Sequence, residues 1–173
     1  MSLPGSPRPL PVIYDGPELL KWPDPRLQLV CDPVPPLESG FGFFNEGSEL
    51  HKLLDYMWQK AEELMGYGLA APQLGSPTRA LVIHVPGGCK VELINPEITK
   101  VWGGKFISEE GCLSYPGETV RVMRHRMIKV HGQDRYGHPV SFGGKNVQAA
   151  ALQHEIDHLN GINLADYAEG RAT

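Results

Sequence analysis

The chain has 173 residues, enough for one domain with a sizeable core, and its composition, 41% apolar and 21% charged, is that of a soluble globular protein. A formal net charge of -4 gives no basic field for binding a nucleic acid backbone, and no stretch approaches the roughly 20 consecutive apolar residues of a membrane span. Three cysteines without regular spacing argue against a disulfide framework and favour a reducing compartment, so the cytoplasm is the expected location, with no support for an organelle.

The N-terminal residues, 1–17, are rich in proline and lack the apolar core of a secretory signal. We interpret them as an arm that precedes a single folded domain, residues 18–173. Residues 41–46 look like a small insertion before the first helix.

A first helix is predicted over residues 48–65, where apolar side chains recur at three- and four-residue steps and form one stripe. Ser48 is suited to cap its N-terminus and Gly66 to end it. Short strands follow in runs rich in Val, Ile and Leu, and residues 133–137 are typical of a hairpin connection. The predicted strands cover residues 80–85, 91–94, 119–122 and 127–131.

A second helix is predicted from Asn146, as N-cap, to Asn160, with Gly161 ending it. The order of helix, strands and helix indicates an α+β fold in which antiparallel β-sheets pack around this late, central helix.

The late helix contains His154, Glu155 and His158. Two histidines four positions apart lie on one helical face, about 6 Å apart along the axis, so both imidazoles can bind one metal ion. Glu155 then projects beside the vacant coordination position, where it can take a proton from metal-bound water and return it to a leaving group. The alternative is a chance pair of surface histidines.

The third ligand separates the possible classes of metallohydrolase. One zinc protease pattern places a third histidine where this chain has Leu164, and other zinc proteases use a carboxylate from a later helix. Asp166 and Glu169 are expected to be too near the terminus to lie on such a packed helix. The third ligand is therefore expected upstream of His154.

Cys112 is the best upstream candidate, because Gly111 permits a close backbone approach and a thiolate is a strong ligand for Zn²⁺ or Fe²⁺. Cys31 and Cys89 are interpreted as inert residues. The remaining histidines each stand alone, and we expect them to be structural or exposed. They are His51, His84, His125, His131 and His138.

Together, several segments resemble the peptide deformylase family. Residues 66–73 resemble its glycine-rich motif, 110–114 match its cysteine motif and 153–159 match its helix motif, while 22–27 resemble its early Pro-Asp-Pro segment. The resemblance spans about residues 18–165 and implies hydrolytic removal of the formyl group from N-formylmethionine of nascent polypeptides, with release of formate.

The resemblance also implies site roles. Cys112, His154 and His158 would hold the metal, and Glu155 would act as general acid and base while metal-bound water attacks the formyl carbon. Gln73 and the Leu113 backbone N–H would hold the oxyanion.

The glycine-rich and cysteine motifs would also bind substrate. Gly68 would let the substrate backbone approach and pair as an added strand. Glu110 would pair with a basic side chain, and Arg124 would brace the cysteine loop. The implied substrate-binding residues are Gly66, Tyr67, Gly68 and Gly111.

A site of one cysteine and two histidines accepts Fe²⁺, Zn²⁺, Ni²⁺ or Co²⁺, and the resemblance favours Fe²⁺ as the physiological ion. The implied partners are N-formylmethionyl nascent peptides and the ribosome near its exit tunnel.

Two alternatives stay open at this point. One is a related metallohydrolase that removes another small acyl group, through changes near Tyr67, Tyr115 or Leu152. The other is a non-enzymatic module with a closed structural zinc site, against which stands the lack of a fourth cysteine or histidine nearby.

Overall fold

The computed structural model describes residues 18–36 and 42–173, so the predicted arm and Phe41 of the predicted insertion lie outside the described residues. Residues 42–46 turn before the first helix, and Phe44 among them is buried in the core. The elements, in chain order, are η1 (Pro25–Gln28), α1 (Glu49–Glu63), β1 (Gly68–Ala70), η3 (Ala71–Leu74), β2 (Ala80–Ile83), β3 (Val91–Cys112), β4 (Tyr115–Gln133), β5 (Pro139–Lys145), α2 (Val147–Leu159) and α3 (Leu164–Ala168).

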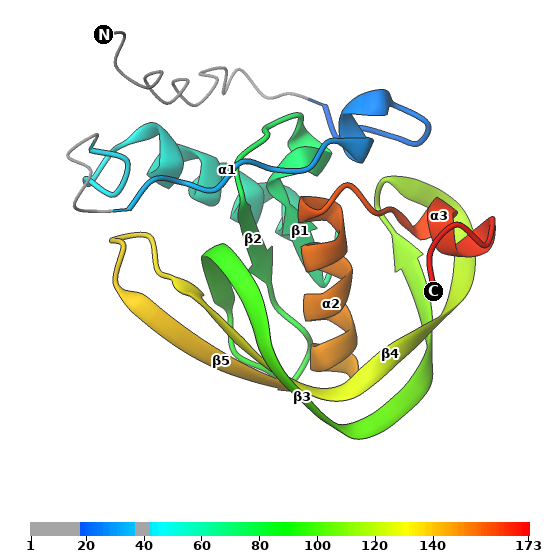
Figure 1. The fold of residues 1–173 in the computed structure, drawn as a ribbon. Coiled ribbons are helices and arrows are strands. Elements are labelled where there is room, and N and C mark those ends of the chain that lie inside the picture. Colours follow the sequence, from blue (N-terminus) through cyan, green and yellow to red (C-terminus); the bar gives the residue numbers. More distant parts are fainter. Residues whose placement is uncertain (1–17, 37–41) are drawn as a thin grey trace, which may run out of the picture.

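The predicted antiparallel pairing is confirmed. Within the described ranges the strands form one five-stranded sheet in the order β1-β2-β3-β4-β5, and each neighbouring pair is antiparallel. The long, curved strands β3 and β4 pass around α2 (Figure 1). The chain thus has an α+β fold of one domain, with an antiparallel sheet and few helices.

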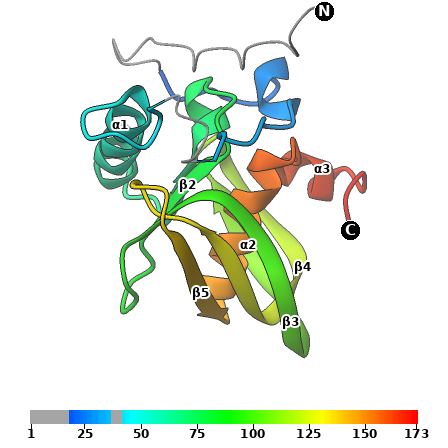
Figure 2. The ribbon, with the colours of Figure 1, turned by 60° about the vertical axis from the view of Figure 1, so that its left-hand side comes forward.

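Strand β2 is covered on both faces, which explains its continuous apolar sequence. Ala80 and Val82 pack in the cluster around α1, whereas Leu81 and Ile83 pack in the cluster around α2. Successive side chains of a strand point to opposite faces, so a strand between two helices needs no polar alternation. Figure 2 shows α1 and α2 on opposite sides of β2.

The predicted first helix is confirmed, but its end differs in detail. Ser48 caps it by accepting a hydrogen bond from the His51 N–H at 3.4 Å. The left-handed residue after the helix is Met65, with φ of 55°, and not Gly66. A Cβ on Gly66 would lie 2.8 Å from Leu113 Cδ1, so the glycine makes room for Leu113.

The second helix is confirmed from Val147 to Leu159, and Gly161 follows it with φ of 73°. Asn146 is the N-cap residue, as predicted, but its side chain makes no capping hydrogen bond. Its Oδ1 accepts instead from Arg126 Nη1 at 3.3 Å. The hairpin connection at 133–137 is confirmed between β4 and β5, where Asp134 accepts hydrogen bonds from the backbone N–H groups of Tyr136 and His138.

The strand predictions were wrong in extent. The run 91–94 is only the start of the 22-residue strand β3, and the runs 119–122 and 127–131 belong to the single strand β4. The prediction that Asp166 is too near the terminus to lie on a packed helix was also wrong. Asp166 lies on helix α3, beside the buried Leu164 and Ala165. The Asp166 carboxylate accepts from the Asn163 N–H and from Arg171.

None of the helices in the described ranges is long and apolar enough to cross a membrane.

Candidate active site

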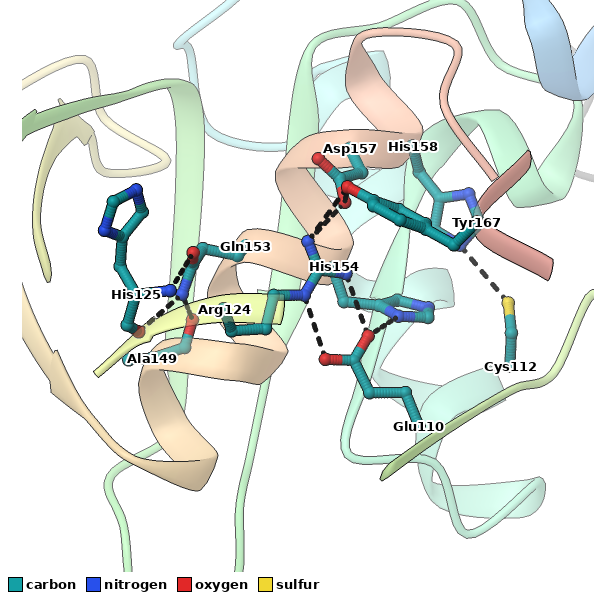
Figure 3. Close-up of polar contacts among 10 residues, drawn as sticks. All are labelled: Glu110, Cys112, Arg124, His125, Ala149, Gln153, His154, Asp157, His158 and Tyr167. Carbon is teal, nitrogen blue, oxygen red and sulfur yellow. Dashed lines mark hydrogen bonds and ion pairs between the residues drawn. The ribbon is translucent and has the colours of Figure 1, made fainter. Parts of the chain in front are cut away.

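Three groups able to bind a metal converge where the end of β3 meets α2. One ligand atom from each of Cys112, His154 and His158 lies within 4.8 Å of the others. Cys112 Sγ is 3.3 Å from His158 Nε2, and the two imidazole centroids are 5.0 Å apart (Figure 3). The helical spacing of the histidines and the position of the cysteine at a strand end produce this cluster. The other five histidines lie outside it.

The chemistry of this cluster fits a divalent cation. Burial alone would raise the pKa of the Cys112 thiol, but the His158 and His154 imidazoles beside it lower that pKa to about 5. The sulfur is therefore held as a thiolate, which is the form that binds a metal. Two imidazoles complete a donor set typical of zinc and of other first-row transition metals.

Glu155 is the least satisfied polar side chain beside this cluster. Its carboxylate is buried, and Oε2 has no hydrogen-bond partner among the described residues. Burial raises the pKa of Glu155 to about 7, although His154 and His158 act in the opposite direction. A pKa near neutrality suits a group that must both accept and donate a proton. Unpaired buried polar atoms are rare in folded proteins, so this one indicates a functional site.

His154 is oriented by a buried ion pair. Its Nδ1 lies 3.0 Å from Glu110 Oε2, so Nδ1 donates to the carboxylate and Nε2 is left free for a ligand. Arg124 donates to both oxygens of Glu110, at 2.9 and 2.8 Å. Burial would raise the pKa of Glu110, but the hydrogen bonds from Arg124 and His154 lower it to about 2. The predicted pairing of Glu110 with a basic side chain is thus confirmed, and the partner is Arg124.

The same arginine reaches α2 and α3 (Figure 3), which sequence reasoning missed. Arg124 Nη1 donates to Asp157 Oδ2 at 2.6 Å, and the Tyr167 hydroxyl donates to the same oxygen at 2.8 Å. The guanidinium also lies 5.0 Å from the centroid of the Tyr167 ring. The sequence offered one indication of Asp157, an acidic residue between the buried Ile156 and His158, but none of Tyr167.

Gln73 lies with its amide beside the thiolate. The Gln73 Oε1 accepts from the Ala70 N–H at 2.9 Å, which fixes the amide orientation. Its Nε2 then faces Ser114 Oγ at 3.1 Å and Cys112 Sγ at 3.8 Å. Leu113 follows Cys112 directly in the turn between β3 and β4. The structure therefore brings both predicted oxyanion donors to the metal-ligand cluster.

A cavity of about 640 Å³ opens onto these groups. The predicted substrate-binding residues all line it, as do Gln73, Leu113, Cys112, His154 and Glu155. Gly68 has a further reason to be glycine, because a Cβ there would lie 2.6 Å from Glu155 Oε1. Gly111 has no such constraint, since its Cβ would meet only the Glu118 carbonyl oxygen at 3.8 Å. The predicted substrate-binding residues that line the cavity are Gly66, Tyr67, Gly68 and Gly111.

Comparison with known proteins identifies the family that this chain resembles. Residues 17–173 match the family described as Polypeptide deformylase. The sequence is 39% identical over 155 residues to the peptide deformylase of Hydrogenovibrio crunogenus, covering 88% of this chain and 86% of the relative. It is 48% identical over 119 residues to the peptide deformylase of Alkaliphilus metalliredigens, covering 69% of this chain and 80% of the relative.

Solved structures give the same result. A class I type b peptide deformylase from Acinetobacter baumannii superposes with a TM-score of 0.79 at 33% identity, covering 86% of this chain and 96% of that one. The Arabidopsis thaliana peptide deformylase 1B superposes with a TM-score of 0.76 at 30% identity, covering 87% of this chain and 80% of that one.

Proposed function

The chain belongs to the polypeptide deformylase family, and on that premise we propose how its own residues carry out the reaction. The protein is a peptide deformylase, which removes the formyl group from N-formylmethionine of nascent polypeptides and releases formate. The observation that carries the assignment of roles is the buried Glu155 carboxylate, whose Oε2 has no partner in the described part of the chain, beside three metal-capable side chains.

Cys112, His154 and His158 would hold one divalent ion, which makes α2 the metal-binding helix at the centre of the fold. When bound, the ion supplies Lewis acidity, which lowers the pKa of water and polarises a carbonyl group. We propose Fe²⁺ as the physiological ion, because the family resemblance favours it, while Zn²⁺, Ni²⁺ and Co²⁺ suit the same donors.

Glu155 handles the proton. Its carboxylate accepts a proton from the attacking water, whose oxygen bonds to the formyl carbon. It then passes that proton to the methionine nitrogen as the C–N bond breaks, so a free amine and formic acid leave, and the acid ionises to formate. Burial supports this role, since the pKa of about 7 lets the carboxylate hold the proton between the two steps.

Gln73 and Leu113 stabilise the negative charge that develops on the formyl oxygen. The Gln73 Nε2 and the Leu113 N–H are uncharged donors held by the fold, so they do not reorganise during the reaction. Gln73 is fixed through its hydrogen bond to Ala70, and Leu113 by its place in the tight turn after Cys112.

The substrate backbone is proposed to lie along β1, which forms one edge of the described sheet. An extended peptide can add to such an edge as a further strand. Gly66, Tyr67, Gly68 and Gly111 line the cavity beside that edge. We place this encounter with nascent peptides near the ribosomal exit tunnel in the cytoplasm, with residues 1–17 as an arm before the catalytic domain.

Formate release tests the function. Anaerobically purified protein with quantified metal should release formate from a short N-formylmethionyl peptide and leave the matched N-acetylmethionyl peptide intact, because the acetyl methyl group crowds the attacked carbon. Equal hydrolysis of both peptides would favour the alternative of a broader acyl hydrolase. No formate release by the metal-loaded protein would overturn the assignment.

Metal content tests the ligand set. Cys112→Ala should lose most of the bound metal after dialysis, because two imidazoles alone bind a divalent ion far more weakly than the complete set. Cys89→Ala is the matched control, since Cys89 is exposed and lies outside the cluster. Unchanged metal in Cys112→Ala would mean that the third ligand is another residue.

A further inference from the structure

The segment 20–22 binds to the backbone of the two proposed oxyanion donors, Gln73 and Leu113, and of Ser114 beside them. Each residue of the segment donates one hydrogen bond to a backbone carbonyl. The bonds join Leu20 N to Gln73 O, Lys21 Nζ to Leu113 O and Trp22 N to Ser114 O, each at 2.8 Å. We call this group of three hydrogen bonds the clasp.

The clasp joins two separate parts of the oxyanion site. Gln73 belongs to η3, whereas Leu113 and Ser114 lie at the turn from β3 to β4. The Gln73 side chain also joins the two parts directly, since its Nε2 donates to Ser114 Oγ at 3.1 Å. By binding both parts, the segment 20–22 fixes the distance between two donors that must reach one oxygen atom.

Lys21 is the one member of the clasp that acts through its side chain. Its ammonium group binds the carbonyl of Leu113, the residue whose N–H is a proposed oxyanion donor. Lys21 also lines the cavity, so its positive charge lies at the wall of the space that receives the substrate. Fixing the Leu113 carbonyl restrains rotation of that residue, and a nearby cation favours negative charge that develops in the cavity.

We propose that Lys21 is a positioning residue of the oxyanion hole, which holds Leu113 in the orientation that deformylation requires. This inference rests on the proposed function, since it assigns Leu113 the role of oxyanion donor. Lys21 is exposed, so a merely structural contact would contribute little to stability and nothing specific to turnover.

Steady-state kinetics provide the first test. Lys21→Met should lower kcat about tenfold and leave KM within about twofold, because the loss of orientation is felt mainly in the transition state. Lys21→Arg, which can still donate to the carbonyl, should keep kcat within about threefold of the unchanged protein. Lys52→Met is the control, because Lys52 is an exposed lysine of α1 paired with Glu49.

The kinetic outcomes distinguish the possible roles. An increase in KM with unchanged kcat would make Lys21 a direct substrate contact and overturn the proposal. A kcat equal to that of Lys52→Met, with or without a lower melting temperature, would also overturn it. Formate release by the unsubstituted protein is measured first, so a failure of the proposed function is recognised separately from a failure of the Lys21 role.

A second readout needs no turnover. In protein labelled with ¹⁵N at leucine and serine, Lys21→Met should shift the amide signal of Ser114, whose N–H belongs to the same peptide unit as the Leu113 carbonyl. It should also shift the signal of Leu113, because the backbone of that residue is no longer restrained. Lys52→Met should leave both signals in place. Unshifted Leu113 and Ser114 signals in Lys21→Met would show that the lysine does not hold this peptide.

Discussion

Two sets of polar side chains meet at α2, and they differ in whether their hydrogen bonds are complete. The paired set is Glu110, Arg124, Asp157 and Tyr167, whose polar atoms bind one another. The open set is Cys112, Glu155 and His158, in which Glu155 Oε2 and His158 Nδ1 have no partner among the described residues. The difference indicates which groups support the site and which perform its chemistry.

Helix geometry keeps the two sets apart although their residues alternate in sequence. Glu155 and Asp157 are two positions apart, and each residue of a helix turns by about 100°, so the two carboxylates point roughly 200° apart. One therefore faces the cavity and the other faces Arg124. His154 connects the sets, since its Nδ1 binds Glu110 and its other nitrogen is available to a metal.

The largest expected effect comes from the open set. Glu155→Gln should lower kcat about a thousandfold, because the amide cannot accept and return a proton. Metal content should not change, since Glu155 is not among the three ligand residues. Glu118→Gln is the control, as Glu118 also lines the cavity. Normal turnover by Glu155→Gln would assign the proton transfer to another group.

Substitutions in the paired set should instead lower the free energy of unfolding. Arg124→Met leaves Glu110 and Asp157 without their cation in a buried setting, and we expect a loss of about 3 kcal/mol in the free energy of unfolding. Arg121→Met, at an exposed position of the same strand, should change it by less than about 0.5 kcal/mol. Chemical denaturation of the metal-loaded proteins measures both. Equal stability of the two variants would mean that the buried carboxylates do not depend on Arg124.

Gly68 tests how closely the open set is packed. Gly68→Ala places a Cβ 2.6 Å from Glu155 Oε1, and displacement of that carboxylate should lower kcat about a hundredfold. Gly143→Ala is the control, since its Cβ would have no neighbour within 4 Å. The predicted role of Gly68 in substrate approach requires an increase in KM. A change in KM alone would therefore show that backbone approach, and not crowding of Glu155, explains the glycine.

The helices were predictable because their signals are local. Apolar side chains at helical spacing defined α1, whereas Asn146 and Gly161 marked the two ends of α2. The spacing of His154 and His158 placed both on one face of that helix. The full length of β3 was not predictable. Gly103 and Gly104 both have positive φ, and such a pair in the sequence is typical of a turn between two strands. In the structure the register of pairing between β3 and β4 shifts at these glycines, and the strand continues beyond them.

The support of the site was predictable only in part. The family resemblance implied that Glu110 pairs with a basic side chain and that Arg124 braces the cysteine loop, but only the structure shows that these two residues are partners. The hydrogen bond from the Tyr167 hydroxyl to Asp157 could not be predicted from the sequence, because it depends on how residues 160–163 turn the chain back towards α2. A hydrogen bond across such a turn leaves no periodic pattern in the sequence.

Substitution of Tyr167 should have the smallest effect on stability, and it separates the contribution of the Tyr167 hydroxyl from that of the Arg124 guanidinium. Burial raises the pKa of Tyr167 to about 12, so its hydroxyl stays protonated and donates to Asp157 at neutral pH. Tyr167→Phe removes this bond but keeps a ring against Arg124, which still binds Asp157. We expect a loss of about 1 kcal/mol in the free energy of unfolding and unchanged metal content. Tyr136→Phe, at an exposed tyrosine, should have no measurable effect. If Tyr167→Phe were as destabilising as Arg124→Met, the hydroxyl of α3, and not the guanidinium of β4, would be the group on which the paired set depends.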